Sequence, residues 1–268
     1  MNSAPKRKNQ DGFTLLEMMV AVAIFIVISG AIFSLLSDSQ KSFRTESQVL
    51  GSFEEARLGL DQIVRDANDA GYPPLNHFAV TPLTPTYTVG PLAWSPTYPA
   101  APCQIGTAGG GTCTSPTDFD VIFEGDNDGT GVNWTRYQLV GTTLFRGVTP
   151  KVLGLDPVAA TAVAGVMLPY VTNVMNNATP GQIAQFQAYY PTMFPNNLPV
   201  PIFQYTCDIP NNVPFPCTNV VAAGNNFPTN VRDIEITLIV MTPQRDAQNN
   251  RFRLVEMNGR GHRINPNK

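Results

Sequence analysis

The chain has few of the residues from which enzyme active sites are built. Its 268 residues include two histidines, His77 and His262, and no Gly-x-Ser-x-Gly motif or phosphate-cradling glycine loop. No nucleophile and base stand at a spacing typical of catalysis. Four cysteines are present without a Cys-x-x-Cys motif, so the histidines and cysteines offer no zinc site. The sequence therefore indicates a protein that is not an enzyme and that needs no cofactor.

Charged residues are also scarce in two long segments. Residues 70–117 contain no Asp, Glu, Lys or Arg, and Asp208 is the single charged residue of residues 157–231. The low charge argues against charge-driven disorder, and the abundant Pro and Asn argue against regular elements. We expect both segments to form long ordered loops that cover a sheet, with a short helix or strand within residues 159–174.

One apolar run near the N-terminus is long and almost free of charge. Between Phe13 and Leu36 the only charged residue is Glu17, and a basic stretch with Lys6, Arg7 and Lys8 precedes the run. About 20 apolar residues span a bilayer, whereas the apolar region of a secretory signal peptide has about 7 to 15. A carboxylate within a membrane helix costs roughly 2.5 to 3.5 kcal/mol, so an ordinary anchor leaves Glu17 unexplained.

The residues at this boundary carry a family resemblance. Residues 12–25 read Gly-Phe-Thr-Leu-Leu-Glu-Met-Met-Val-Ala-Val-Ala-Ile-Phe. This sequence resembles the class III leader of type IV pilins and of the pseudopilins of type II secretion. The resemblance implies that a prepilin peptidase cuts between Gly12 and Phe13 and that the new amine of Phe13 is methylated. Removal of the leader, residues 1–12, would take the formal net charge from −3 to −5.

The resemblance also implies a role for Glu17 in assembly. In a fibre the Phe13 amine would be a buried positive charge, and a buried charge is tolerated when it is paired. Glu17 of a neighbouring subunit can supply that partner, but Phe13 and Glu17 are also four residues apart and can meet within one helix. The expected partners are other major and minor pilins through this helix, the prepilin peptidase and the inner membrane. The basic leader stays in the cytoplasm by the positive-inside rule, which places the head outside it, and the pilus is the later location.

The helical pattern continues beyond the apolar run. No proline occurs between Phe13 and Tyr72, and Gly71-Tyr-Pro-Pro then stops the helix. Its second half is amphipathic, with apolar residues at Leu50, Phe53, Ala56, Leu60, Ile63 and Ala67 and charged ones on the opposite face, Asp61, Arg65 and Asp66 among them. We therefore predict a membrane or fibre-core helix over residues 13–36, a head-packing half over 37–70 and a globular head over 71–268.

The head contains recognisable strands. Alternating or apolar stretches predict strands at residues 118–124, 133–140, 143–148, 231–241 and 251–257, the last two pairing antiparallel. Asp118 and Asp120 lie on one face of the first strand, as solvated edge residues do. The predicted class is α+β: a pilin-like lollipop with one long helix on a mostly antiparallel sheet. The size and the helix resemble the larger PilW-like minor pilins.

The cysteines fall into two local pairs, Cys103 with Cys113 and Cys207 with Cys217. Disulfides persist outside the cytoplasm, where the head is expected. Spacing alone allows three connectivities, and pairing within each loop is our prediction.

Two further features leave alternatives open. Asp126 and Asp128 lie in a Glu-Gly-Asp-Asn-Asp-Gly stretch that resembles a calcium loop, although a polar turn between strands is favoured because no Glu stands at the twelfth position. The basic C-terminal segment from Arg245 to Lys268 can attract nucleic acid, but a solvated tail that protects a sheet edge is favoured. The function we expect is that of a minor pilin in pilus initiation and assembly. The alternatives are a minor pseudopilin of type II secretion and a tip-displayed adhesin or DNA-uptake subunit.

Overall fold

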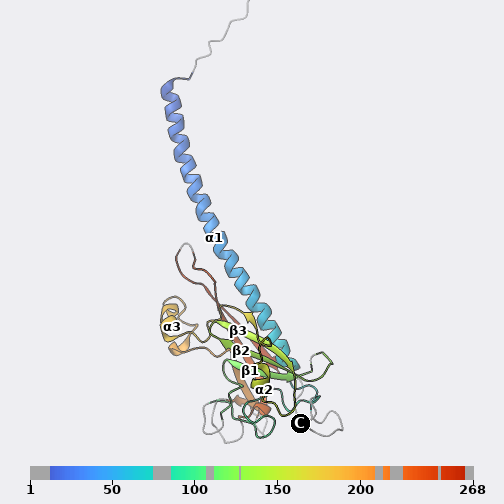
Figure 1. The fold of residues 1–268 in the computed structure, drawn as a ribbon. Helices are drawn as coiled ribbons and strands as arrows, with labels where there is room; N and C mark the ends of the chain where they lie inside the picture. The colour runs from blue at the N-terminus through green and yellow to red at the C-terminus, as the bar shows by residue number, and fades with distance from the viewer. Residues whose placement is uncertain are drawn as a thin grey trace, which may run out of the picture.

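The protein consists of one long helix that projects from a β-rich head (Figure 1). The structure is a computed structural model, and it describes residues 13–74, 86–106, 112–126, 128–208, 214–217, 226–246 and 249–262. Helix α1 spans Leu15–Asp69, and its 55 residues give a rod of roughly 80 Å. Antiparallel sheets follow it, so the α+β lollipop expected from the sequence is the observed architecture.

Two four-stranded antiparallel sheets form the head, where the sequence suggested one. The first has the order β1-β2-β3-β4 and the second the order β6-β5-β7-β8. The strands of the first sheet are Asp120–Gly125, Asn133–Val140, Thr143–Pro150 and Leu168–Val171. The strands of the second, in chain order from β5 to β8, are Phe203–Asp208, Pro214–Pro216, Val231–Met241 and Leu254–His262. β7 pairs with β8 from Asp233 opposite His262 to Met241 opposite Leu254.

The segment of residues 157–231 is more regular than its composition suggested. Its described residues form strands β4, β5 and β6 and four short helical elements. These are α2 at Pro157–Thr161, α3 at Pro180–Gln187, η1 at Pro195–Asn197 and η2 at Pro228–Asn230. Proline occupies an early position in each of these helices, where its missing N–H costs nothing. Abundant proline was the reason for expecting loops in this segment, but four of the prolines lie at the start of short helices. By contrast, the described parts of residues 70–117 form loops with isolated bridges.

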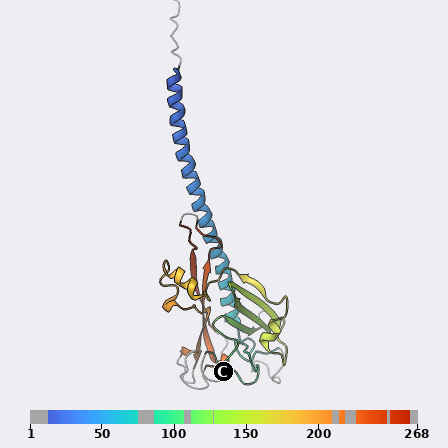
Figure 2. The same ribbon diagram turned by 60° about the vertical axis from the view of Figure 1, so that its left-hand side comes forward.

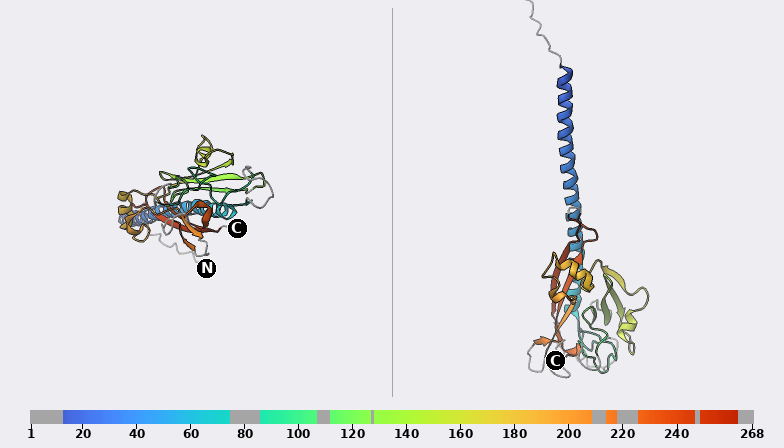
Figure 3. Two further views of the ribbon diagram at one scale, coloured as in Figure 1. Left: turned by 90° about the horizontal axis from the view of Figure 1, so that it is seen from below. Right: turned by 90° about the vertical axis from the view of Figure 1, so that its left-hand side faces the viewer.

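The C-terminal half of α1 lies between the two sheets (Figure 3, left). Ala56, Leu60 and Ile63 are buried in a single core cluster with residues of both sheets. Small residues allow the close approach. A Cβ built on Gly261 of β8 would come within 2.4 Å of the Ala67 side chain, and one on Gly59 of α1 within 2.4 Å of Val171 in β4. Glycine is thus required at these contacts because there is no room for a methyl group.

An ion pair with a buried carboxylate fixes the helix to the first sheet. Asp66 of α1 is 2 % exposed and accepts hydrogen bonds from the Tyr137 hydroxyl at 2.6 Å and from Arg146 Nη2 at 3.0 Å. Burial, and then the Asp66 charge, raise the pKa of Tyr137 above its usual range, so this hydroxyl remains a donor. The sequence placed Asp66 on the exposed polar face of the helix. That prediction was wrong because the helix is covered on two sides.

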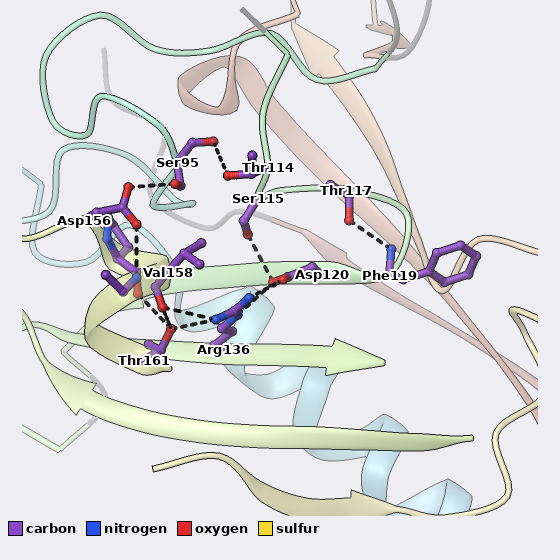
Figure 4. A network of polar contacts seen from close by, with 12 residues as sticks. Ser95, Thr114, Ser115, Thr117, Phe119, Asp120, Arg136, Asp156, Val158 and Thr161 are labelled. Atoms are coloured by element: carbon purple, nitrogen blue, oxygen red, sulfur yellow. Dashed lines mark hydrogen bonds and ion pairs between the residues drawn. The ribbon is translucent and has the colours of Figure 1, made fainter. Parts of the chain in front are cut away.

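A second buried pair lies inside the first sheet (Figure 4). Arg136 Nη2 donates to Asp120 Oδ2 at 2.5 Å, and a further Arg136 nitrogen reaches the Thr161 hydroxyl in α2 at 3.2 Å. Burial raises the pKa of Asp120, while the hydrogen bonds and charge of Arg136 act in the opposite direction. The expectation that Asp120 is a solvated edge residue is therefore corrected. Through Arg136 it anchors α2 across the face of the sheet.

We predict that Gly261→Ala lowers the free energy of unfolding of the head by about 1 to 3 kcal/mol, the usual cost of overpacking. The added methyl group would overlap the Ala67 side chain. Urea unfolding of the full chain in detergent micelles, followed by the fluorescence of the buried Trp94 and Trp134, measures this. Gly181→Ala is the matched control, because a Cβ there meets nothing within 4 Å. Equal stability of the two variants would contradict the close packing of α1 on β8.

We also predict that Asp66→Ala lowers the free energy of unfolding by about 3 kcal/mol, since it leaves Arg146 and the Tyr137 hydroxyl without their anionic partner. The exposed Asp61 on the same helix is the control, and Asp61→Ala should change stability by no more than about 0.5 kcal/mol. The same urea titration distinguishes the two. A loss no larger in Asp66→Ala than in Asp61→Ala would show that the pair does not hold the helix.

Candidate assembly site on the N-terminal helix

The apolar part of α1, up to residue 36, is not buried against the described part of its own chain. None of residues 13–44 is buried, and the helix leaves the head as a bare rod (Figures 1 and 2). Its large apolar side chains are mostly more than half exposed, with Phe13 at 83 % and Leu35 at 74 %. By length and composition α1 can cross a membrane. An apolar surface of this size marks a site for lipid or for other protein chains.

The helix begins at Leu15 because Thr14 and Glu17 cap it. The Glu17 amide donates to the Thr14 hydroxyl oxygen at 3.3 Å, and the Thr14 amide and hydroxyl each donate to Glu17 Oε2 at 3.0 Å. This is a capping box, in which the two residues satisfy each other's backbone donors. This role of Glu17 goes beyond those expected from the sequence, although the Thr-x-x-Glu spacing is the sequence signal of a capping box.

The capping box leaves Glu17 able to bind a cation. Its described hydrogen bonds use Oε2, so Oε1 can accept from an outside donor. Glu17 is also the only charged residue on the exposed apolar surface of residues 13–36. A cation from a neighbouring helix would therefore find one defined partner there. Phe13 lies just before the cap, while Gly12, the expected site of cleavage, lies outside the described residues.

The cysteines are joined within their own loops. Cys103 is bonded to Cys113, and Cys207 in β5 to Cys217 just after β6. By the chain-entropy estimate, a closed loop of this size contributes somewhat under 3 kcal/mol. Each bridge closes a short loop, and residues 107–111 and 209–213 of these loops lie outside the described residues. The bridges are consistent with a head that folds outside the reducing cytoplasm.

The carboxylates of the acidic turn between β1 and β2 bind the backbone of that same turn. Asp126 Oδ1 accepts from the Gly129 amide at 2.7 Å, and Asp128 Oδ1 accepts from the Thr130 amide at 3.0 Å. In the described residues, no group of three His, Cys, Asp or Glu side chains lies close enough to hold a metal ion. A calcium site at Asp126 and Asp128 stays a prediction from the sequence, and the observed bonds are those of a polar turn.

The basic C-terminal segment is partly neutralised. Arg253 pairs with the buried Asp246 at 2.8 Å, and Arg260 with the buried Asp233 at 2.8 Å. Strand β8, which carries Arg260, forms an edge of the second sheet. Arg263 and Lys268 lie outside the described residues. The described part of this segment is therefore less positive than its composition suggests.

Comparison with known protein families identifies a motif near the N-terminus of the chain. Residues 7–33 match the family model described as the prokaryotic N-terminal methylation motif. The match covers part of the leader, the capping box and the first part of the apolar helix, about a tenth of the chain. Comparisons with curated proteins and with solved structures find no match. The motif thus characterises the bare helix, and it points to a structural protein that associates with others of its kind.

We predict that Glu17→Gln and Thr14→Val separate capping from charge pairing. Glu17→Gln can retain the capping box but removes the charge, whereas Thr14→Val removes the cap and retains the carboxylate. If Glu17 pairs with a buried amine, losing its charge costs about 3 to 5 kcal/mol, and Glu17→Gln should be nearly absent from sheared fibres. Loss of a cap costs about 1 kcal/mol, so Thr14→Val should still be incorporated.

Immunoblots of cleaved protein and of sheared fibres from the same cells measure both steps. If both variants enter fibres as the parent does, Glu17 is not an assembly contact. If Glu17→Gln remains uncleaved, the carboxylate serves recognition by the peptidase instead.

Proposed function

We propose that this chain is a minor pilin that takes part in initiating and assembling a type IV pilus. The observation that carries the proposal is the methylation motif at the start of a helix whose apolar residues, up to residue 36, are exposed in the described part of the chain. Exposing such an apolar surface to water is energetically unfavourable, so lipid or neighbouring helices must cover it. When a subunit moves from the membrane to the fibre, neighbouring helices replace lipid around this surface, and the head does not need to refold.

The membrane stage follows from the charge distribution. Lys6, Arg7 and Lys8 precede the apolar helix, and the rule for cytoplasmic positive charge keeps them inside. The head, with its two disulfides, then lies on the outer side of the inner membrane. Prepilin peptidase would release residues 1–12, after which the methylated Phe13 begins the mature chain. Other pilins are the partners of the exposed helix.

A minor pseudopilin of type II secretion is the second candidate, since the same motif and helix serve both systems. A deletion strain distinguishes the two. Loss of surface pili with normal protein secretion supports the pilus assignment, and loss of secretion with normal pili supports the pseudopilus. A tip adhesin or DNA-uptake subunit would in addition show binding to a surface or to DNA by the intact fibre.

The processing step gives a direct prediction. Gly12→Ala should leave most of the chain uncut, because the added methyl group obstructs an extended backbone in the peptidase cleft, whereas glycine has no side chain. Mass spectrometry of the membrane fraction should find the full leader, and sheared fibres should lack the protein. Asn9→Ala, a change within the leader but away from the expected cut, is the control and should be processed normally. Mature protein of normal size in Gly12→Ala cells would contradict the assigned cut.

A further inference from the structure

An open cleft lies between α3 and the connection from β7 to β8. Its volume is about 470 Å³, and Tyr189, Arg245, Arg251 and Phe252 are among the residues that line it. The connection is the part of the head that reaches furthest along α1 toward its N-terminus (Figures 1 and 2). Gln244 at its start accepts a hydrogen bond from Gln48 of α1 at 3.0 Å. The cleft therefore lies at the end of the head nearest the bare half of the helix.

Two cations in this cleft have no anionic partner in the described residues. Arg245 donates to the Asn250 carbonyl oxygen at 3.1 Å, and within that part of the chain no ion pair joins Arg245 or Arg251 to a carboxylate. The nearby Asp246 is buried and is bound by Arg253 and by the side-chain amide of Asn249. It cannot turn toward the cleft without breaking those bonds. We call this site the arginine cleft.

Aromatic rings hold the two guanidinium groups in place. The Arg251 guanidinium carbon lies 3.6 Å from the centre of the Tyr189 ring, and that of Arg245 lies 4.8 Å from the centre of the Phe252 ring. A guanidinium stacked on a ring keeps its N–H groups free at its edge, where they match the two oxygens of a carboxylate. The arginine cleft is therefore suited to carboxylate groups on an extended or turning chain.

The opposite end of the head presents carboxylates. The amide of Asp126 donates to the carbonyl oxygen of Tyr72 at 2.8 Å, just beyond the C-terminal end of α1. Asp126 and Asp128 bind their own turn through Oδ1, and within the described residues no hydrogen bond uses Oδ2 of either, so that oxygen can accept from an outside donor. Hydrogen bonds from Thr130, first of its hydroxyl and then of its amide, lower the pKa of Asp128, so this carboxylate stays charged.

We propose that the arginine cleft of one copy binds Asp126 and Asp128 of a second copy, in a head-to-tail contact along the axis of α1. The inference rests on the proposed function, since the bare helices must first bring the subunits together. Complementary patches at opposite ends of a molecule make a heterologous contact, in which one patch of a copy faces the other patch of its neighbour. The contact would set the order of heads outside the packed helices.

Charge exchange in the full chain tests this contact. Arg245→Glu with Arg251→Glu, and Asp126→Arg with Asp128→Arg, are compared alone and combined in one chain. A photo-crosslinking amino acid at the exposed Ala188, which lines the cleft, reports the neighbour in cells. Each reversal alone should reduce the crosslinked dimer about tenfold, equivalent to about 1.4 kcal/mol of binding free energy. The combined variant should recover most of it.

Two results would overturn the proposal. One is a crosslink from Ala188 to another protein or to lipid, identified by mass spectrometry, in place of the peptide that holds Asp126 and Asp128. The other is unchanged dimer in the single reversals. Asp126→Asn with Asp128→Asn keeps the acceptors of the turn, so loss of dimer in this variant reports charge and not misfolding. If the parent protein enters fibres and the reversals have no effect, this inference alone fails; if the parent never enters fibres, the proposed function fails with it.

Discussion

The bare apolar half of α1 is the constraint on which the rest of the molecule depends. No residue from 13 to 44 is buried, so the head leaves this surface to lipid or to other chains. The head must nevertheless hold the other half of the same helix firmly, because any force on the bare half is transmitted through it. The observed arrangement meets this need by placing two sheets on opposite sides of one rod (Figure 3).

Two kinds of contact hold the helix in the head. Gly261 in β8 and Gly59 in α1 bring the helix and the sheets closer than any side chain would allow. Asp66 then adds a directional contact, because Tyr137 and Arg146 from adjacent strands both donate to it. A buried carboxylate with two donors at defined positions specifies the orientation of the helix more narrowly than apolar packing does. The C-terminal half of the helix is thus part of the core of the head.

Much of this fold follows from local sequence patterns, and the exceptions have physical reasons. Periodicity predicts the long helix, and it predicts β2 and β7 with the observed bounds. The strand predicted at residues 251–257 instead starts at Leu254 and continues through Gly259 and Gly261 to His262. Those glycines resemble turn residues in sequence, but they stand in the strand because α1 lies against them.

Strand β5 and one buried ion pair could not be predicted from local sequence patterns. Strand β5 was missed because prolines and asparagines surround its alternating Phe203, Tyr205 and Cys207. The pairing of Asp120 with Arg136 joins two strands and depends on the assembled sheet, so spacing along the chain does not reveal it. At the candidate site the sequence identified Glu17 and its apolar surroundings, whereas the second role of Glu17 in the cap emerged only from the structure.

We propose that the bare helix carries the mature N-terminus of a fibre subunit. Mass spectrometry of the N-terminal peptide from sheared surface fibres of unmodified cells tests it most directly. We expect a peptide that begins at Phe13 with a methylated amine and lacks Lys6, Arg7 and Lys8. A peptide that retains residues 1–12, or a mature chain that begins elsewhere, would contradict it.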